Sequence, residues 1–141
     1  MKLRQYCAYQ ERCHSEVRDK LREYGVYFND ADEVIAKLIE DDYLNEERFA
    51  KMFAGGKFRM KQWGKKKIEY ELKQRQVSAY CIKKAMKEIG ADDYEDTLLR
   101  LIEQKRKALN GSNTLHARKK IMDFLLQKGY EYSMIASKLN K

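Results

Sequence analysis

The chain has 141 residues, of which 43% are hydrophobic and 37% charged, and its formal net charge is +8 at pH 7. It contains no proline, and such a chain, rich in Lys, Glu, Leu and Ala, favours an all-helical fold over a sheet-rich one. No apolar run approaches the ~18–20 residues of a membrane span, and Met1–Tyr6 lacks the apolar core of a signal peptide. We therefore expect a cytoplasmic protein without membrane contact.

The cysteines and histidines do not form a recognisable catalytic or metal-binding pattern. Cys7, Cys13 and Cys81 have no C-x-x-C spacing and fit reduced thiols of a cytoplasmic protein. Nothing near His14 or His116 supplies a nucleophile and a base, and no Gly-rich phosphate loop or paired-carboxylate motif is present. We expect a non-enzyme with no cofactor and no metal.

The first third of the chain predicts three short helices. The first covers Leu3–Gln10. The second lies between Cys13 and Gly25, with Ser15 as the expected cap, and a third is predicted over Asp32–Ile39.

The middle third opens with a helix predicted over Asn45–Gln62. Its first residue has a side chain that can accept hydrogen bonds from the backbone N–H groups of the first turn. One apolar face is predicted from Phe49, Met52 and Phe53, which recur at helical spacing. Gly64 is the expected stop of this helix.

A basic run follows the apolar face. Six Lys or Arg and no acid lie between residues 57 and 67, together with the only tryptophan. The candidate partner- or DNA-binding residues are Lys57, Arg59, Lys61, Trp63, Lys65, Lys66 and Lys67. Alternatively, the charges solvate a helix end and the tryptophan packs at a helix corner. Three lysines at a predicted helix start oppose the helix dipole, so we hypothesise that Lys65–Lys67 face an anionic surface.

The positive charge is concentrated in this part of the chain. Residues 1–42 hold 7 basic and 10 acidic side chains, net −3; residues 43–90 hold 13 and 5, net +8; residues 91–141 hold 10 and 7, net +3. A concentrated basic region suggests an anionic partner, such as nucleic acid or an acidic protein face.

The last third begins with a helix predicted over Asp92–Leu109, and residues 110–113 read as a loop. Here an internal repeat becomes visible. Equivalent apolar positions recur at offsets of 51 and 53 residues: Val17, Ile68 and Ile121; Leu21, Leu72 and Leu125; Val26, Val77 and Tyr130. A fourth set, Val34, Ile82 and Ile135, requires a three-residue insertion after Val26.

The repeat predicts an all-α fold of three tandem three-helix repeats, 1–42, 43–90 and 91–141, stacked into an elongated, curved, solenoid-like array. Gly25 and Gly129 occupy positions where a helix ends through a left-handed residue. The middle repeat has Gln76 there, which indicates either mild strain or a different turn.

Two stretches resemble the RecX family of regulatory proteins. Tyr43–Ala50 (YLNEERFA), followed by Trp63-Gly64 and Ile68-x-x-x-Leu72, is similar to that family's central signature, and Arg12–Leu21 is similar to its first repeat. The resemblance covers nearly the whole chain. It implies an elongated, curved, all-helical protein that lies in the groove of the RecA recombinase filament on DNA and modulates it, usually as an inhibitor, without catalytic residues. We expect the protein to be a monomer.

The chain departs from the family pattern at four positions: Cys13 stands where Ser is common, Asn45 where Asp is, Lys65 where Pro is, and Gln76 where Gly is. Two other interpretations stay open beside the recombinase regulator. One is a basic helical module that binds single- or double-stranded DNA directly, and the other is a repeat scaffold whose charges only solvate it. These three interpretations are separated by two measurements: whether binding requires the recombinase or occurs on bare DNA, and how steeply binding falls with salt.

Overall fold

The computed structural model describes residues 2–140 and contains helices but no strand within that range. The helices are α1 (Lys2–Tyr9), α2 (His14–Glu23), α3 (Phe28–Glu40), α4 (Glu46–Gly56), the π-helical segment η1 (Lys57–Lys61), α5 (Lys65–Gln74), α6 (Ala79–Met86), α7 (Ala91–Ala108), α8 (Leu115–Lys128) and α9 (Tyr132–Leu139). The predicted all-α fold is confirmed.

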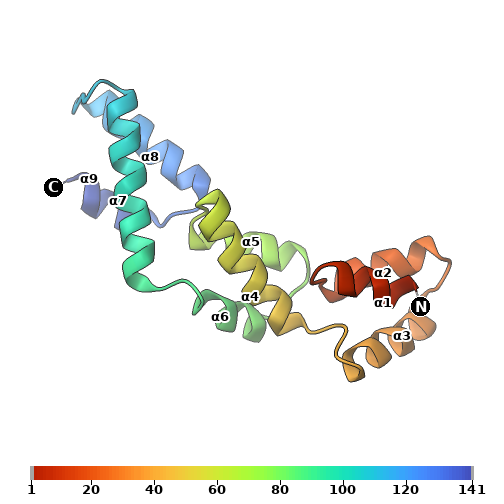
Figure 1. The fold of residues 1–141 in the computed structure, drawn as a ribbon. Helices are drawn as coiled ribbons and strands as arrows, with labels where there is room; N and C mark the ends of the chain where they lie inside the picture. The colour runs from red at the N-terminus through yellow and green to blue at the C-terminus, as the bar shows by residue number, and fades with distance from the viewer. Residues whose placement is uncertain (1, 141) are drawn as a thin grey trace.

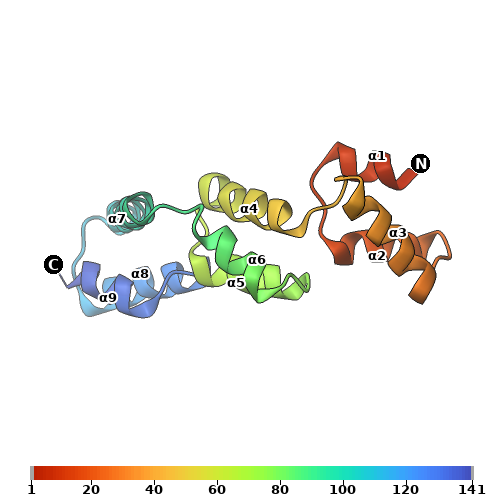
Figure 2. The ribbon, with the colours of Figure 1, turned by 90° about the horizontal axis from the view of Figure 1, so that it is seen from below.

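The helices form a row of three units, α1–α3, α4–α6 and α7–α9, which we call the first, middle and third unit. Figures 1 and 2 show an elongated, curved arrangement in which the described chain begins at one end and finishes at the other. This is the array that the repeat predicts. No helix within residues 2–140 has the length and apolar character needed to cross a bilayer.

The core is divided unequally along this row. The middle and third units share one cluster of buried residues, which includes Ile68, Leu98 and Ile121. The first unit has a smaller cluster around Val17 and Leu21, while its Cys13 at the start of α2 packs into the larger cluster. The expectation that neighbouring repeats share a core therefore holds best for the middle and third units.

The repeated apolar positions are buried except in the first unit, where Val26 and Val34 are only partly buried. Val17, Ile68 and Ile121 are at most 1% exposed, and the leucine set is equally well buried. Val34, however, is only partly buried, whereas Ala31 is 1% exposed and packs into the core. Ala31 lies five residues after Val26, the same spacing that separates Val77 from Ile82, so the predicted three-residue insertion is wrong.

All three units use the same turn after their second helix. The N–H of the residue after the turn donates to the carbonyl of the helix five residues earlier: Val26 to Leu21 (2.9 Å), Val77 to Leu72 (3.1 Å) and Tyr130 to Leu125 (3.1 Å). This is the Schellman closure of a helix end, and it requires a left-handed residue in between. Gly25, Gln76 and Gly129 have φ values of 77°, 60° and 102°, so Gln76 adopts the same turn as the two glycines.

Two helix starts in the first unit differ from prediction. The cap of α2 is Cys13 rather than Ser15, and the Cys13 backbone N–H donates to the Glu16 carboxylate at 3.0 Å. Helix α3 begins at Phe28, four residues before the expected Asp32, because the repeat keeps its spacing without the insertion.

The lead helix of the middle unit begins as predicted and ends differently. Asn45 caps α4 by accepting a hydrogen bond from the Arg48 N–H at 2.9 Å. Phe49 is 6% exposed, but Met52 is 60% exposed and does not belong to the buried face. After α4 the chain widens into η1, which stops at a left-handed Gln62 (φ 58°), so Gly64 is not the stop that was expected.

Candidate functional site

The middle and third units meet through backbone contacts beside Gly64. The Gly64 N–H donates to the Lys128 carbonyl at 2.8 Å, and the Lys66 N–H donates to the Gly129 carbonyl at 2.9 Å. A Cβ placed on Gly64 would lie 2.3 Å from the Gly129 carbonyl carbon. Close approach of two backbones, rather than a left-handed turn, is therefore what requires glycine at position 64.

We call this contact between the middle and third units the joint. It involves the free N–H groups at the start of α5. Between the two bonds just described, the Lys65 N–H donates to the Tyr94 hydroxyl at 2.9 Å. Helix α8 thus directs its C-terminal carbonyls at the N-terminus of α5, and the two helix dipoles compensate each other. The N–H groups of Gly64, Lys65 and Lys66 at the α5 N-terminus are consequently occupied, which leaves the lysine side chains as the main groups to meet an anion.

Tyr94 connects α7 to this joint. Its hydroxyl accepts from Lys65 and donates to the Glu131 carboxylate at 3.0 Å, and its ring stacks on Tyr130 with centroids 5.1 Å apart. The Tyr130 hydroxyl donates to the Gln62 carbonyl at 3.0 Å. Burial raises the pKa of Tyr94 and that of Tyr130 above the usual range of the residue, so both phenols stay protonated and hold the joint together.

At the surface of the joint, two lysine side chains contact the ring of the half-buried Trp63. Its ring contacts Phe53 edge-on at 6.3 Å between centroids, and the ammonium groups of Lys57 and Lys67 lie 5.1 and 4.6 Å from its centroid. We call these four residues the Trp63 face. Cation–π contact orients the two ammonium groups without neutralising them.

Lys128 extends the Trp63 face from the third unit. Its ammonium donates to the Lys61 carbonyl at 2.9 Å. Burial, and to a smaller extent the neighbouring Lys67 ammonium, lower the pKa of Lys128. The basic run of the sequence gave no indication of Lys128, because it lies 61 residues beyond Lys67 and joins only when the units pack.

The seven predicted candidates do not form one cluster. Lys57, Trp63 and Lys67 come together on the Trp63 face, and Lys61 lines a hollow with Met52, Phe53 and Met60 beside it. For the other three, no cation–π contact with the Trp63 ring is found among the described residues. Lys65 has its ammonium 4.7 Å from the Tyr94 ring, Arg59 lies beside Asp93 and Asp96 of α7, and Lys66 is exposed.

The cations of this region lack acidic partners, unlike those of the first unit. Within residues 2–140 no ion pair joins a carboxylate to Lys57, Arg59, Lys61, Lys65, Lys66 or Lys67. In the first unit, by contrast, Arg18 pairs with Asp32 at 2.9 Å and Lys20 with Glu23 at 3.1 Å. An uncompensated cluster of positive charge attracts an anionic surface.

The described residues hold no group of three or more His, Cys, Asp or Glu side chains placed to bind a metal ion. The arrangement at the joint orients charge and aromatic surface.

Comparison with known proteins assigns each unit separately. Three family models match in chain order: RecX, first three-helix domain, over residues 5–38; RecX, second three-helix domain, over residues 45–86; and RecX, third three-helix domain, over residues 92–139.

Two curated relatives named Regulatory protein RecX illustrate the similarity. The protein from Bacillus cytotoxicus is 29% identical over 130 residues, which cover 92% of the chain and 48% of that relative. The protein from Clostridium perfringens is 33% identical over 123 residues, covering 86% of the chain and 57% of the relative. The chain thus spans about half the length of these relatives.

Solved structures share the fold. A crystal structure of RecX from Lactobacillus salivarius superposes with a TM-score of 0.86 at 24% identity, over 96% of this chain and 88% of that one. A crystal structure of a regulatory protein RecX gives 0.87 at 16% identity, over 99% and 69%.

Proposed function

The chain belongs to the RecX family of regulatory proteins, and on that premise we propose that it binds the RecA recombinase filament on DNA and lowers its recombinase and ATPase activity. The observation that carries the proposal is the Trp63 face, where lysines of the middle unit and Lys128 of the third gather without acidic partners. A nucleoprotein filament presents phosphate and acidic protein surface, the kind of partner that such a face fits.

The shape of the molecule supports the same proposal. Units in an elongated row can follow an extended, regular partner over a long distance (Figure 2). We expect the protein to act as a monomer in the cytoplasm.

Direct action on DNA is the second candidate function. The uncompensated lysines favour it, since they suit phosphate. Helix α5, however, begins with lysines and continues with Glu69 and Glu71, and its stretch Lys65–Glu71 contains none of the Asn, Gln and Arg side chains that read base edges well. Any direct binding is expected to be sequence-independent and to weaken steeply with salt.

The test is the DNA-dependent ATP turnover of the recombinase, measured with and without the protein. We expect turnover to fall as the protein is added, and rising salt to weaken the effect because charged contacts are screened. Binding to bare DNA, measured in the same buffers, separates the two candidates. Equal affinity for bare and recombinase-coated DNA would favour the direct DNA-binding module.

A charge reversal tests the Trp63 face itself. Lys57→Glu with Lys67→Glu is expected to raise the concentration for half-inhibition about tenfold or more. The matched control is Lys83→Glu with Lys87→Glu, which changes the net charge equally at two exposed lysines at the end of the middle unit. If both pairs weaken inhibition to the same extent, net charge rather than the Trp63 face is responsible.

A further inference from the structure

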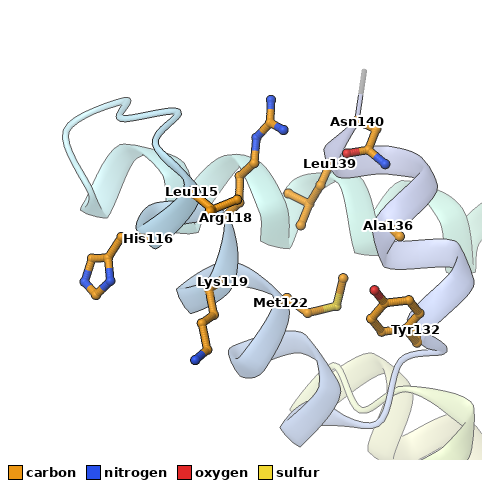
Figure 3. A pocket seen from close by; sticks show the side chains of 9 residues that line it. All are labelled: Leu115, His116, Arg118, Lys119, Met122, Tyr132, Ala136, Leu139 and Asn140. Carbon is orange, nitrogen blue, oxygen red and sulfur yellow. The ribbon is translucent and has the colours of Figure 1, made fainter.

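The third unit has an apolar groove between α8 and α9, at the end of the array away from the first unit. It has a volume of about 720 Å³, and its walls include Leu115, Met122, Tyr132 and Leu139. Figure 3 shows Met122 pointing from α8 toward Tyr132 at the start of α9. Leu115 is 84% exposed and Tyr132 62% exposed, so large apolar side chains border the groove in contact with solvent.

The other two units carry charges at the equivalent positions. Met122 corresponds to Arg18 of the first unit and Glu69 of the middle unit, and Ala136 corresponds to Asp32 and Lys83. In the first unit these two residues form an ion pair, Arg18 to Asp32, at 2.9 Å. The replacement of opposite charges by Met and Ala makes this face apolar in the third unit alone.

An extra turn of helix lengthens the groove. Helices α2 and α5 start at positions equivalent to Arg118, whereas α8 starts three residues earlier, at Leu115. Thr114 caps the added turn, its hydroxyl accepting from the Ala117 N–H at 3.1 Å. The added turn brings the exposed Leu115 to the mouth of the groove.

The charged side chains that line the groove are basic. They are Arg118 and Lys119, with His116 beside them, and no carboxylate belongs to the lining. Neither Arg118 nor Lys119 forms an ion pair with an acid of the described chain, and the Arg118 Nε–H donates instead to the neutral Asn113 side chain at 3.1 Å. The groove therefore combines an apolar floor with an uncompensated positive rim.

We propose that this groove binds an acidic amphipathic helix of a partner protein. Apolar side chains one turn apart on such a helix would enter between α8 and α9, as ridges fit the groove of a helix pair. Carboxylates on its flanks would meet Arg118 and Lys119. Charge complementarity selects an acidic partner segment over a basic one.

The test uses a labelled helical peptide of about four turns, with leucines at i, i+4 and i+7 and glutamates at the flanking positions. A second peptide replaces every glutamate by lysine. Binding to the full chain is followed by fluorescence anisotropy, without DNA or recombinase, so the result is independent of the proposed function. We expect the acidic peptide to bind at least about tenfold more tightly than the basic one, and equal affinities would overturn the proposal.

Placing the middle unit's residues at the equivalent positions of the third unit tests whether the peptide binds in the groove. Met122→Glu with Ala136→Lys copies Glu69 and Lys83, which the middle unit accommodates in the same helices. The pair is expected to weaken binding of the acidic peptide about tenfold or more, with an unchanged circular-dichroism spectrum. Undiminished binding by a folded variant would place the peptide elsewhere.

Two further measurements test the groove as the binding site. Tyr132→Ala copies Ala79 of the middle unit at an exposed position, so it serves if the double variant does not fold, and it is expected to weaken binding several-fold. Sedimentation of the chain alone tests self-association. Concentration-dependent association that disappears in the double variant would make a second copy the occupant and overturn the acidic-partner assignment.

Discussion

Two glycines show how single residues determine the joint between the middle and third units. Gly129 has a φ of 102° and was predicted from the repeated turn, whereas Gly64 has an extended backbone with ψ of 164° and no positive φ. A Cβ on Gly64 would meet the Gly129 backbone at 2.3 Å. Sequence reasoning recognised the first glycine because its role is local. It misread the second, whose neighbour lies 65 residues away.

Gly64→Ala is expected to destabilise the protein by about 3 kcal/mol, because the methyl group collides with backbone and disturbs the hydrogen bond to Lys128. The control is Gly56→Ala in α4, where a Cβ would have no neighbour within 4 Å. That substitution is expected to be neutral or stabilising by up to ~1 kcal/mol, because alanine favours helix. Urea unfolding measures both, and equal effects would show that Gly64 is not in close contact.

The two buried phenols at the joint predict a dependence of stability on pH. Folding raises the pKa of Tyr94 and of Tyr130 through burial. Since the raised pKa favours the protonated folded state, this contribution is fully present below the unfolded pKa of about 10 and is lost as pH rises above it. The contribution of these two phenols to the free energy of unfolding is therefore expected to be constant up to pH ~9 and to fall above ~10.

Tyr94→Phe separates the contribution of the Tyr94 hydrogen bonds to stability from the contribution of its titration at high pH. At neutral pH it is expected to cost about 1–3 kcal/mol, because the Lys65 N–H and the Glu131 carboxylate lose their partner. Above pH ~10 its stability should decline less steeply than that of the wild type. Urea unfolding across this range, with phenolate absorbance followed in parallel, provides the measurement; an equally steep decline would exclude Tyr94 as the titrating group.

At the scale of the helices, local rules predicted those helix termini that a residue type marks in the sequence. The cap at Asn45 and the left-handed turns at Gly25 and Gly129 follow from the residue types themselves. The start of α3 was missed because its cap, Tyr27, makes no side-chain cap hydrogen bond and so leaves no sequence signal. The π-helical turn at Lys57–Lys61 was likewise not predicted, since it shifts the phase of the side chains without any marker residue.

The repeated turn offers a matched exchange between units. Gln76 adopts φ 60° where Gly25 adopts 77° at the equivalent position, and a Cβ on Gly25 would find nothing within 4 Å. We expect Gln76→Gly to stabilise the protein by about 0.5–1 kcal/mol and Gly25→Gln to destabilise it by a similar amount, since only the left-handed backbone is involved. Melting temperatures measure both, and shifts in the same direction would contradict the assignment of one turn to both units.

At the scale of the whole molecule, the basic region could be predicted from the sequence, but which of its residues lie together could not. The run from Lys57 to Lys67 was recognised from its composition alone. Its division between the Trp63 face and the Tyr94 side depends on the packing of α7 and α8 against α5. The same packing adds Lys128, so the composition of the candidate site is a property of two units together.

The unequal cores predict how the array unfolds. Among the described residues, the larger cluster holds 21 buried side chains, all from the middle and third units except Cys13, whereas the smaller cluster holds 7, all from the first unit except Leu44, which precedes α4. A smaller core offsets less conformational entropy, so α1–α3 should open at a lower free energy than α4–α9. Hydrogen exchange is expected to show faster exchange in α2 and α3 than in α5 and α8.

Two substitutions at equivalent positions test whether the first unit opens separately from the middle and third units. Val17→Ala is expected to lower protection in α1–α3 only, because Val17 belongs to the separate cluster. Ile121→Ala should lower it in both the middle and third units, whose helices share the cluster around Ile121, by roughly 2–4 kcal/mol. Loss of protection throughout the chain from Val17→Ala would mean that the three units unfold as one cooperative body.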